Sequence, residues 1–200
     1  MLTLFHAPHS RSSRIVWLLE ELGAAYDIRY VSIRYGDGSG DGPDPANLHP
    51  DKKVPALLHH DTLVSESTAV AMRLCELFSE AGLAPSLEAA ERGAYLTWMC
   101  WVETEFGPAV YARRAGQADA RMQANYQAAL RRVLEALGRG PYLMGENFTV
   151  VDVMAGAVVL FAREHLPESD LIDAYAARLA GRPALGRAWA KDAPTPRAAA

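Results

Sequence analysis

The chain has 200 residues and a formal net charge of −4, with 20 basic and 24 acidic side chains. This balance argues against broad nucleic-acid binding, which needs a basic surface. Half of the residues are apolar, enough for a core of ordinary size, and no apolar run approaches the roughly 20 residues of a membrane span. We therefore expect a globular protein that binds neither nucleic acid nor membrane.

The first third of the sequence alternates between strand and helix patterns. Residues 2–5 are short, apolar and β-branched, as in a strand, and a turn with a proline follows. Apolar residues then recur at helical spacing from Ile15 to Leu22, and Gly23 stands where a helix often ends. Residues 26–33 alternate as a second strand does. A strand–helix–strand unit of this length predicts a parallel pair with a right-handed crossover.

The next segment completes an N-terminal domain. Residues 35–47, rich in Gly, Asp and Pro, predict a loop. A third strand is expected over residues 54–59, and residues 62–64 can pair with it across a short turn. A helix over residues 66–78 follows. These elements predict an α/β domain over residues 1–80.

A linker with a proline at residues 82–86 precedes a segment that is almost entirely helical in pattern. We expect an all-α domain over residues 86–200, with helices at 88–106, 118–137, 150–162, 169–180 and 184–191. The third of these is strongly apolar, which is typical of the buried centre of a bundle. Residues 192–200 are rich in Pro and Ala and are expected to fray.

Two cysteines are present, Cys75 and Cys100, and they form neither a metal-ligand spacing nor a CxxC motif. Both lie in apolar helical patterns, which favours buried thiols. Residues 1–5 are too short and lack the basic residues of a signal peptide. We therefore expect a cytoplasmic protein with reduced thiols. The histidines show no pattern such as HExxH, so no metal is expected, and the pair His59–His60 is interpreted as a surface turn.

Pro55, near the start of the third strand, has two interpretations. A proline lacks an amide donor, so it fits an edge strand in the ordinary trans form. A cis bond between Val54 and Pro55 would instead turn the backbone of Val54 outward. Its N–H and C=O could then pair with an extended peptide, as an added strand does.

Glu66 and Ser67 stand at the start of the helix over residues 66–78. Backbone N–H groups there are unpaired and the helix dipole favours anions, so the carboxylate of a small ligand fits, with the Ser67 hydroxyl as an extra donor. Glu66 could hold an ammonium group. The alternative is plain capping, with Ser65 as the N-cap, and these two residues alone favour that alternative.

Ser10, Ser12 and Ser13 crowd the start of the first helix. They could form an N-cap cluster, which is the simpler interpretation. The functional interpretation is a hydroxyl that donates to a bound thiolate and lowers a thiol pKa that is ordinarily about 8.5. Such a serine is not a nucleophile, because the sequence shows no His and Asp partners to activate it and no G-x-S-x-G motif.

Two features of the helical domain are singled out. Thr149 and Asp152 form a variant of the capping box, which predicts the start of the buried helix. Trp98, Phe106 and Tyr111 lie along and after the first helix of this domain. Core packing is favoured for this group, and Tyr111 is the best candidate to face a cleft between the domains.

Together these segments resemble glutathione transferases over nearly the whole chain. The family's first strand, catalytic loop and first helix are similar to LTLFHAPHSRSSRIVWLLEELGAAYDI. Its cis-proline strand and Glu-Ser glutathione clamp are similar to KVPALLHHDTLVSES, and its capping box and core helix to PYLMGENFTVVDVMAGAVV. The combination and order of these motifs make the resemblance specific.

The resemblance implies a thioredoxin-like N-terminal domain, an all-helical C-terminal domain and glutathione as the co-substrate, without a metal. The γ-glutamyl end would lie at Glu66 and Ser67, and the cysteinyl backbone would pair with Val54 beside Pro55. The family also implies a homodimer and a small hydrophobic electrophile in a cleft, where Trp98, Phe106 and Tyr111 are the candidate contacts. Lys53 and His49 are the nearest candidates to bind the glycyl carboxylate.

The resemblance places Ser10 at the position held by Ser in theta-like members and by Cys in beta-like members. Ser12 and Ser13 stay possible. The chain has no Tyr at the early position that alpha, mu and pi members use, where Phe5 and His6 stand. A serine here favours thiolate stabilisation, whereas a cysteine would favour mixed-disulfide chemistry.

Three hypotheses follow. The first is a glutathione transferase that serves detoxification by presenting the thiolate to an electrophile. The second is a non-catalytic relative that acts as a binding or scaffold protein, although the complete clamp favours an enzyme. The third is a glutathione-dependent isomerase or reductase, and the absence of Cys at the catalytic position weighs against the reductase.

Overall fold

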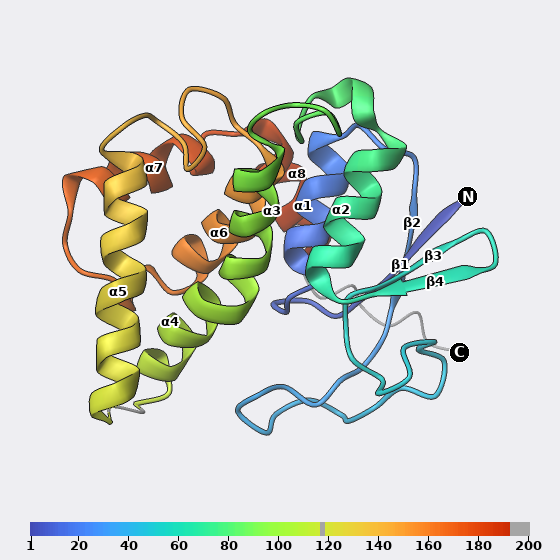
Figure 1. Cartoon of the computed structure of the whole chain (residues 1–200). Coiled ribbons are helices and arrows are strands. Elements are labelled where there is room, and N and C mark those ends of the chain that lie inside the picture. The colour runs from blue at the N-terminus through green and yellow to red at the C-terminus, as the bar shows by residue number, and fades with distance from the viewer. Residues whose placement is uncertain (117–118, 193–200) are drawn as a thin grey trace. The chain divides into compact units, whose positions relative to one another are not determined.

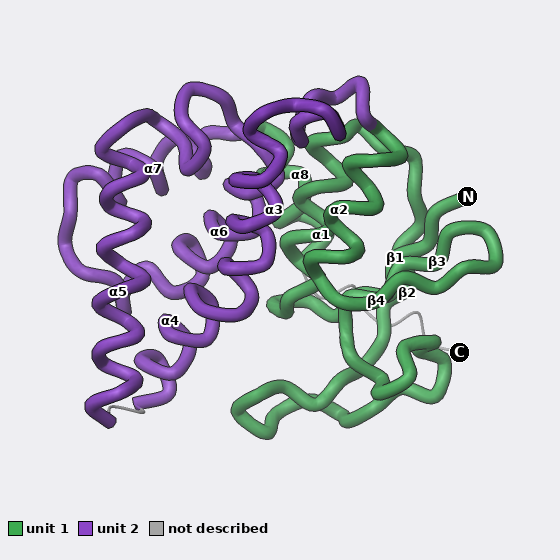
Figure 2. Tube along the Cα trace, viewed as in Figure 1, with its two compact units in different colours: residues 1–78, 183–200 green, residues 79–182 purple. Residues whose placement is uncertain are grey.

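The computed structural model describes residues 1–116 and 119–192. The chain forms two compact units (Figure 2): Met1–Phe78 with the chain from Pro183 onward, and Ser79–Arg182. Most of the segment expected to fray, residues 193–200, lies outside the described residues, as does the first residue of the helix expected over 118–137. Asp192, which the sequence pattern grouped with the fraying segment, is instead the last residue of a helix.

The first unit contains one mixed sheet of four strands (Figure 1). The strands are β1 (Leu2–His6), β2 (Asp27–Tyr30), β3 (Ala56–His59) and β4 (Thr62–Ser65), in the order β2-β1-β3-β4. β1 pairs with β2 in parallel, as predicted, and the other two pairings are antiparallel. Leu4 and Phe5 point to opposite faces of the sheet and both are buried, so both faces of β1 are covered.

Three helices belong to this unit: α1 (Ser13–Glu21), α2 (Ser67–Leu77) and α8 (Pro183–Asp192). α1 buries an apolar face that includes Ile15 and Leu19, and it packs against both α2 and α8. Gly23 follows α1 with φ +60°, the left-handed conformation expected of a helix end.

α8 is held to α1 by an ion-pair cluster around Glu20, whose carboxylate accepts hydrogen bonds from Arg187, Lys191 and Tyr26. Burial opposes ionisation of Glu20, but these donors outweigh it and lower the pKa of the carboxyl to about 2. The sequence pattern grouped residues 86–200 into one helical domain, whereas packing against α1 places α8 in the first unit.

The second unit is helical, with α5 (Ala120–Leu137), α6 (Val150–Phe161) and α7 (Asp170–Ala180) matching predicted helices. The helix expected over 88–106 differs. It consists of α3 (Arg92–Trp101), a π-helical turn η2 (Val102–Phe106) and α4 (Gly107–Arg114). Pro108 has no N–H to continue the hydrogen-bond ladder, so it stands in the first turn of α4 after the π turn. Single 3-10 turns, η1 (Ser79–Ala81) and η3 (Arg163–His165), complete the unit.

The capping box at the start of α6 is confirmed. The Asp152 carboxylate is fully buried and accepts hydrogen bonds from the backbone N–H groups of Thr149 and Leu143, each at 2.9 Å, and from the Tyr175 hydroxyl at 3.0 Å. Desolvation nevertheless raises the pKa of Asp152 above its ordinary value. This helix is buried along most of its length, as its apolar pattern predicted.

The two cysteines have different environments. Cys75 is buried in α2, as expected, but Cys100 is exposed, so that prediction was wrong. The buried face of α3 is made by Tyr95, Trp98 and Met99, and Cys100 falls on the opposite side. None of the helices in the described ranges is both long and apolar enough to cross a membrane.

Candidate functional site

The strand register brings the chemically interesting segments to one edge of the sheet. Phe5 on β1 lies opposite Ala56 on β3, which in turn lies opposite Ser65 on β4. The segments of interest therefore all adjoin one edge of the sheet, where β1 and β4 end and β3 begins. The serine loop follows β1, the Val54–Pro55 pair precedes β3, and the Glu66–Ser67 pair follows β4.

The bond between Val54 and Pro55 is cis, so the trans interpretation is wrong. Val54 precedes the first residue of β3 and lies outside the ladder. Within the described residues, its backbone N–H and C=O have no hydrogen-bond partner. An extended peptide could therefore pair with this edge.

The start of α2 is uncapped. Glu66 is the N-cap residue and makes no side-chain capping bond within the described part of the chain. Ser65 is the last residue of β4, so the proposed capping by Ser65 is wrong. Glu66 is exposed and has φ +67° and ψ 126°, a strained conformation for a residue with a side chain.

The Ser67 side chain lies at this same open helix end. The residue is 3% exposed, and its hydroxyl has no partner among residues 1–116 and 119–192. The helix end thus combines the first backbone N–H groups of α2, the Ser67 hydroxyl and an exposed carboxylate. That set can bind both charged groups of an α-amino acid.

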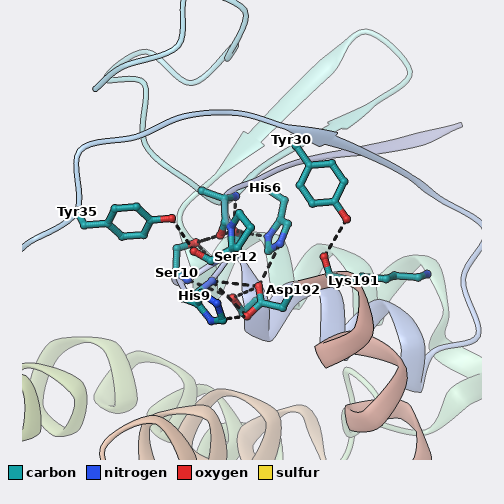
Figure 3. A network of polar contacts seen from close by, with 11 residues as sticks. His6, His9, Ser10, Ser12, Tyr30, Tyr35, Lys191 and Asp192 are labelled. Carbon is teal, nitrogen blue, oxygen red and sulfur yellow. Dashed lines mark hydrogen bonds and ion pairs between the residues drawn. The ribbon is translucent and has the colours of Figure 1, made fainter. Parts of the chain in front are cut away.

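The three serines at the start of α1 have different environments (Figure 3). Ser10 is partly exposed, and its hydroxyl lies 2.7 Å from both the Ala7 carbonyl oxygen and the Ser12 hydroxyl. Ser12 is fully buried and Ser13 donates to Asp192 at 2.7 Å. Ser12 stands at the N-cap position, but no side-chain cap bond forms there among the described residues. The N-cap cluster is therefore not the arrangement that these serines adopt.

A buried histidine and a buried aspartate complete this cluster, and the sequence pattern had indicated neither. His6 Nδ1 lies 2.7 Å from Ser12 Oγ, and His6 Nε2 lies 3.1 Å from Asp192 Oδ1. The latter contact is close but is not aligned as a full hydrogen bond. Figure 3 shows His6 between the serine loop and the end of α8. Its position in β1 resembles that of a core residue, and its partner is 186 positions away, so no local signal reveals the pair.

Asp192 also accepts hydrogen bonds from the His9 backbone N–H, at 3.2 Å to each carboxylate oxygen. Burial raises the pKa of Asp192, but the close contact with His6 and the hydrogen bonds from Ser13 and the His9 backbone outweigh it, so the pKa is lowered overall. The carboxylate is therefore ionised at neutral pH.

Asp192, His6 and Ser12 follow one another in the order of a hydrolase triad. Ser12 has no exposed surface, however, and its hydroxyl also lies in contact with Ser10 and Ala7. A nucleophile must reach a substrate carbonyl, which this hydroxyl does not. The cluster therefore supports a hydrogen-bonding role better than a nucleophilic one.

The two residues proposed to bind a glycyl carboxylate differ in their exposure. His49 is buried, and its Nδ1 accepts a hydrogen bond from the Asp51 backbone N–H at 3.0 Å. Lys53 is exposed, with its ammonium 3.7 Å from an Asp51 carboxylate oxygen. Lys53 is thus the more available cation.

The three aromatic candidates belong to the helical unit. Trp98 and Phe106 are buried, as core packing predicts, whereas Tyr111 is half-buried with its ring edge toward Phe161. Trp98 also lines a cavity of about 810 Å³, where the Arg132 guanidinium lies 4.5 Å from the Trp98 ring centre. Among the described residues, no cluster of His, Cys, Asp or Glu is arranged to bind a metal ion.

Comparison with known proteins agrees with this architecture. The family model "Glutathione S-transferase, N-terminal domain" matches residues 1–72. The chain is 27% identical to disulfide-bond oxidoreductase YfcG of Escherichia coli (strain K12), over 96% of this chain and 95% of that protein. It also resembles the crystal structure of a theta-class glutathione S-transferase from Xanthomonas axonopodis pv. citri with glutathione bound. The TM-score is 0.74 at 28% identity, covering 94% of this chain and 96% of that one.

A glutathione transferase from Methylococcus capsulatus str. Bath has the same fold, with a TM-score of 0.80 at 24% identity over 96% of this chain and 98% of that one. The fold is therefore a thioredoxin-like mixed sheet with helices, followed by a helical unit. Residues 1–72 therefore match a glutathione S-transferase N-terminal domain, and the chain as a whole resembles glutathione transferases in fold.

Proposed function

We propose that this protein binds glutathione and stabilises its thiolate for attack on a small hydrophobic electrophile. The observation that carries this proposal is the uncapped start of α2, which shares one sheet edge with the open backbone of Val54 and with the serine loop. A structure left open in this way fits a ligand that supplies the missing partners.

Each part of glutathione has a matching group at this edge. The γ-glutamyl carboxylate would accept hydrogen bonds from the N–H groups of α2 and from Ser67, and its ammonium would pair with Glu66. The cysteinyl backbone would pair with Val54 as an added strand. Lys53 is the cation proposed for the glycyl carboxylate. The glutathione bound to the Xanthomonas relative supports this choice of ligand.

Ser10 is the serine that we propose to contact the sulfur. It is partly exposed, whereas Ser12 is buried and Ser13 donates to Asp192. By turning from the Ala7 carbonyl, the Ser10 hydroxyl could donate to a thiolate. Each unit by which the thiol pKa falls corresponds to about 1.4 kcal/mol of preference for the anion.

Other features are carried over as proposals from the family. Tyr111, which is half-buried, is the aromatic residue proposed to contact the electrophile, and Trp98 and Phe106, which are buried, are the other two candidates. We also propose a cytoplasmic homodimer that serves detoxification.

The test is Ser10→Ala. We expect the turnover number for glutathione conjugation to fall about 10- to 100-fold, the value of one hydrogen bond to a charged group, while the Kd for glutathione changes little. Ser86→Ala, in the segment that precedes α3 in the second unit, is the matched control. If the turnover number is unchanged in Ser10→Ala but falls in Ser12→Ala or Ser13→Ala, the serine whose replacement lowers it is the one that contacts the thiolate. Failure of the wild type both to bind glutathione and to conjugate any of a panel of electrophiles overturns the proposal.

A second candidate is glutathione-dependent disulfide reduction, because the YfcG relative aligned over 96% of this chain is a disulfide-bond oxidoreductase. The test compares reduction of a small organic disulfide with conjugation by the same preparation. Reduction without conjugation would favour this second candidate over the first.

A further inference from the structure

The end of α8 places a carboxylate beneath the serine loop. Asp192 is 7% exposed and contacts the loop through Ser13, the His9 backbone and His9 Nδ1, the last at 3.4 Å. The helix is held in place from its other side by Arg187 and Lys191 on Glu20. The position of α8 is therefore set by contacts that do not involve the Asp192 carboxylate.

From Asp192 a continuous chain of polar contacts leads to the surface. It runs from the carboxylate to His6 Nε2 (3.1 Å), from His6 Nδ1 to Ser12 Oγ (2.7 Å), and from Ser12 Oγ to Ser10 Oγ (2.7 Å). Figure 3 shows these residues as one connected network. Only the Ser10 end of this chain lies on a partly exposed residue.

Counting protons limits how this chain can be arranged. A carboxylate only accepts, so His6 Nε2, which faces it, carries a proton. If Nδ1 carries no proton, Ser12 must donate its hydroxyl proton to His6. The hydrogen bond between Ser10 and Ser12 then requires the hydroxyl proton of Ser10. If Nδ1 is also protonated, His6 donates to Ser12 and Ser12 donates to Ser10. The Ser10 proton is then not needed at Ser12, and it can turn from the Ala7 carbonyl oxygen, to which it donates at 2.7 Å, toward a ligand.

In the outward arrangement the positive charge of the His6 ring lies beside the Asp192 carboxylate, which is 3.1 Å from Nε2. A hydroxyl that already accepts a hydrogen bond is also a stronger donor, because successive hydrogen bonds polarise one another. Both effects would improve Ser10 as a donor to an anion.

We propose that Asp192 is a positioning residue, which acts through His6 and Ser12 to direct the Ser10 hydroxyl toward a bound thiolate. The inference rests on the proposed function, since it needs glutathione beside Ser10. It makes the end of α8, which is remote in sequence, part of the thiol-activating machinery.

The neighbouring charged and titratable groups face this network from several elements. Tyr30 on β2 packs its ring edge against His6 and donates to the Lys191 carbonyl oxygen. Tyr35 donates to the Pro8 carbonyl oxygen at 2.7 Å, and burial together with the Asp192 charge raises its pKa. Tyr35 therefore stays neutral, and Asp192 supplies the negative charge at His6.

The experiment compares Asp192→Asn with the wild type. Asparagine keeps an oxygen to accept from Ser13 and the His9 backbone but lacks the charge. The readout is the ultraviolet absorbance of the thiolate of bound glutathione as a function of pH. We expect the pKa of the bound thiol to rise by about one unit, with a tenfold fall in turnover number at neutral pH and a small change in the Kd for glutathione.

Arg187→Ala is the matched control, because it removes an exposed α8–α1 ion pair without touching Asp192. It should leave the thiol titration unchanged. In a double variant of Asp192→Asn with Ser12→Ala, the bound thiol should titrate as it does in Ser12→Ala alone. The reason is that both substitutions interrupt the same series of polar contacts. If Asp192→Asn does not fold, as judged by circular dichroism, Asp192→Glu takes its place: it keeps the charge and displaces the carboxylate.

The outcomes separate the two proposals. A wild type that binds glutathione without forming thiolate overturns the proposed function and this inference with it. A normal wild-type titration that is unchanged in Asp192→Asn overturns the inference alone. A shift of equal size in Arg187→Ala also overturns the inference, because docking of α8 would then be the cause.

Discussion

The helices α2 and α6 both begin with a hydroxyl residue near an acidic one, yet they begin in opposite ways. At α6, Asp152 is buried and accepts hydrogen bonds from two backbone N–H groups and a tyrosine hydroxyl. At α2, Glu66 is exposed and neither it nor Ser67 makes a capping bond within the described residues. One helix end is completed by the protein and the other is available to a ligand. Similar residue types therefore complete the helix start in one unit, and we propose that they bind glutathione in the other.

The largest expected effect concerns the completed end. Asp152→Ala leaves four buried donors, among them the Thr149 hydroxyl, without their acceptor, so the free energy of unfolding should fall by about 3 kcal/mol. Urea unfolding measures this. Asp119→Ala is the matched control, since Asp119 caps the exposed start of α5 through the Met122 N–H, and it should cost only about 1 kcal/mol. Equal losses in the two variants would contradict the special role of the buried cap.

The next effect concerns the open end. Ser67→Ala removes a hydroxyl without an internal partner, so the free energy of unfolding should change by less than about 0.5 kcal/mol. Affinity for glutathione should fall about 10- to 100-fold, because a hydrogen bond to a carboxylate is lost. Isothermal titration calorimetry measures the affinity, with Ser65→Ala on β4 as the control. A stability loss without a loss of affinity would show that this serine belongs to the fold.

The smallest effect tests whether the backbone at Glu66 is held in a costly conformation. Glu66→Gly relieves the strain at φ +67°, offset in part by the greater freedom of glycine in the unfolded chain, for a net gain of about 1 kcal/mol in unfolding free energy. The same change should weaken glutathione binding, because the ammonium loses its carboxylate. Thermal unfolding and calorimetry measure the two effects. A variant that is less stable, or that binds glutathione as before, would contradict this account.

Much of the fold could be predicted because its signals are local. The helical spacing from Ile15 to Leu22, the glycine after it and the capping box at Thr149 each lie within one turn or helix. The π turn before Pro108 was missed because the apolar pattern continues through it. Of the candidate site, the Glu66–Ser67 pair and Pro55 were recognised from their place beside predicted elements.

The cluster behind Ser10 could not be predicted in the same way. His6 has the alternation of a core strand, and Asp192 stands in a stretch whose prolines and alanines suggest disorder. What joins them is the packing of α8 against α1, and side-chain periodicity does not say which helix a given apolar face will meet. Ser65 was misassigned for a related reason: pairing of β4 with β3 extends the strand through that residue.

The membership of α8 in the first unit has a consequence for synthesis of the protein. The ribosome releases the sheet, α1 and α2 early, but the helix that covers α1 is made after the whole helical unit. Domains usually fold in the order in which they emerge. Here the sheet, α1 and α2 must wait, with part of the apolar surface of α1 uncovered, until α8 has been made. Nascent chains that stop short of α8 are thus expected to depend on chaperones.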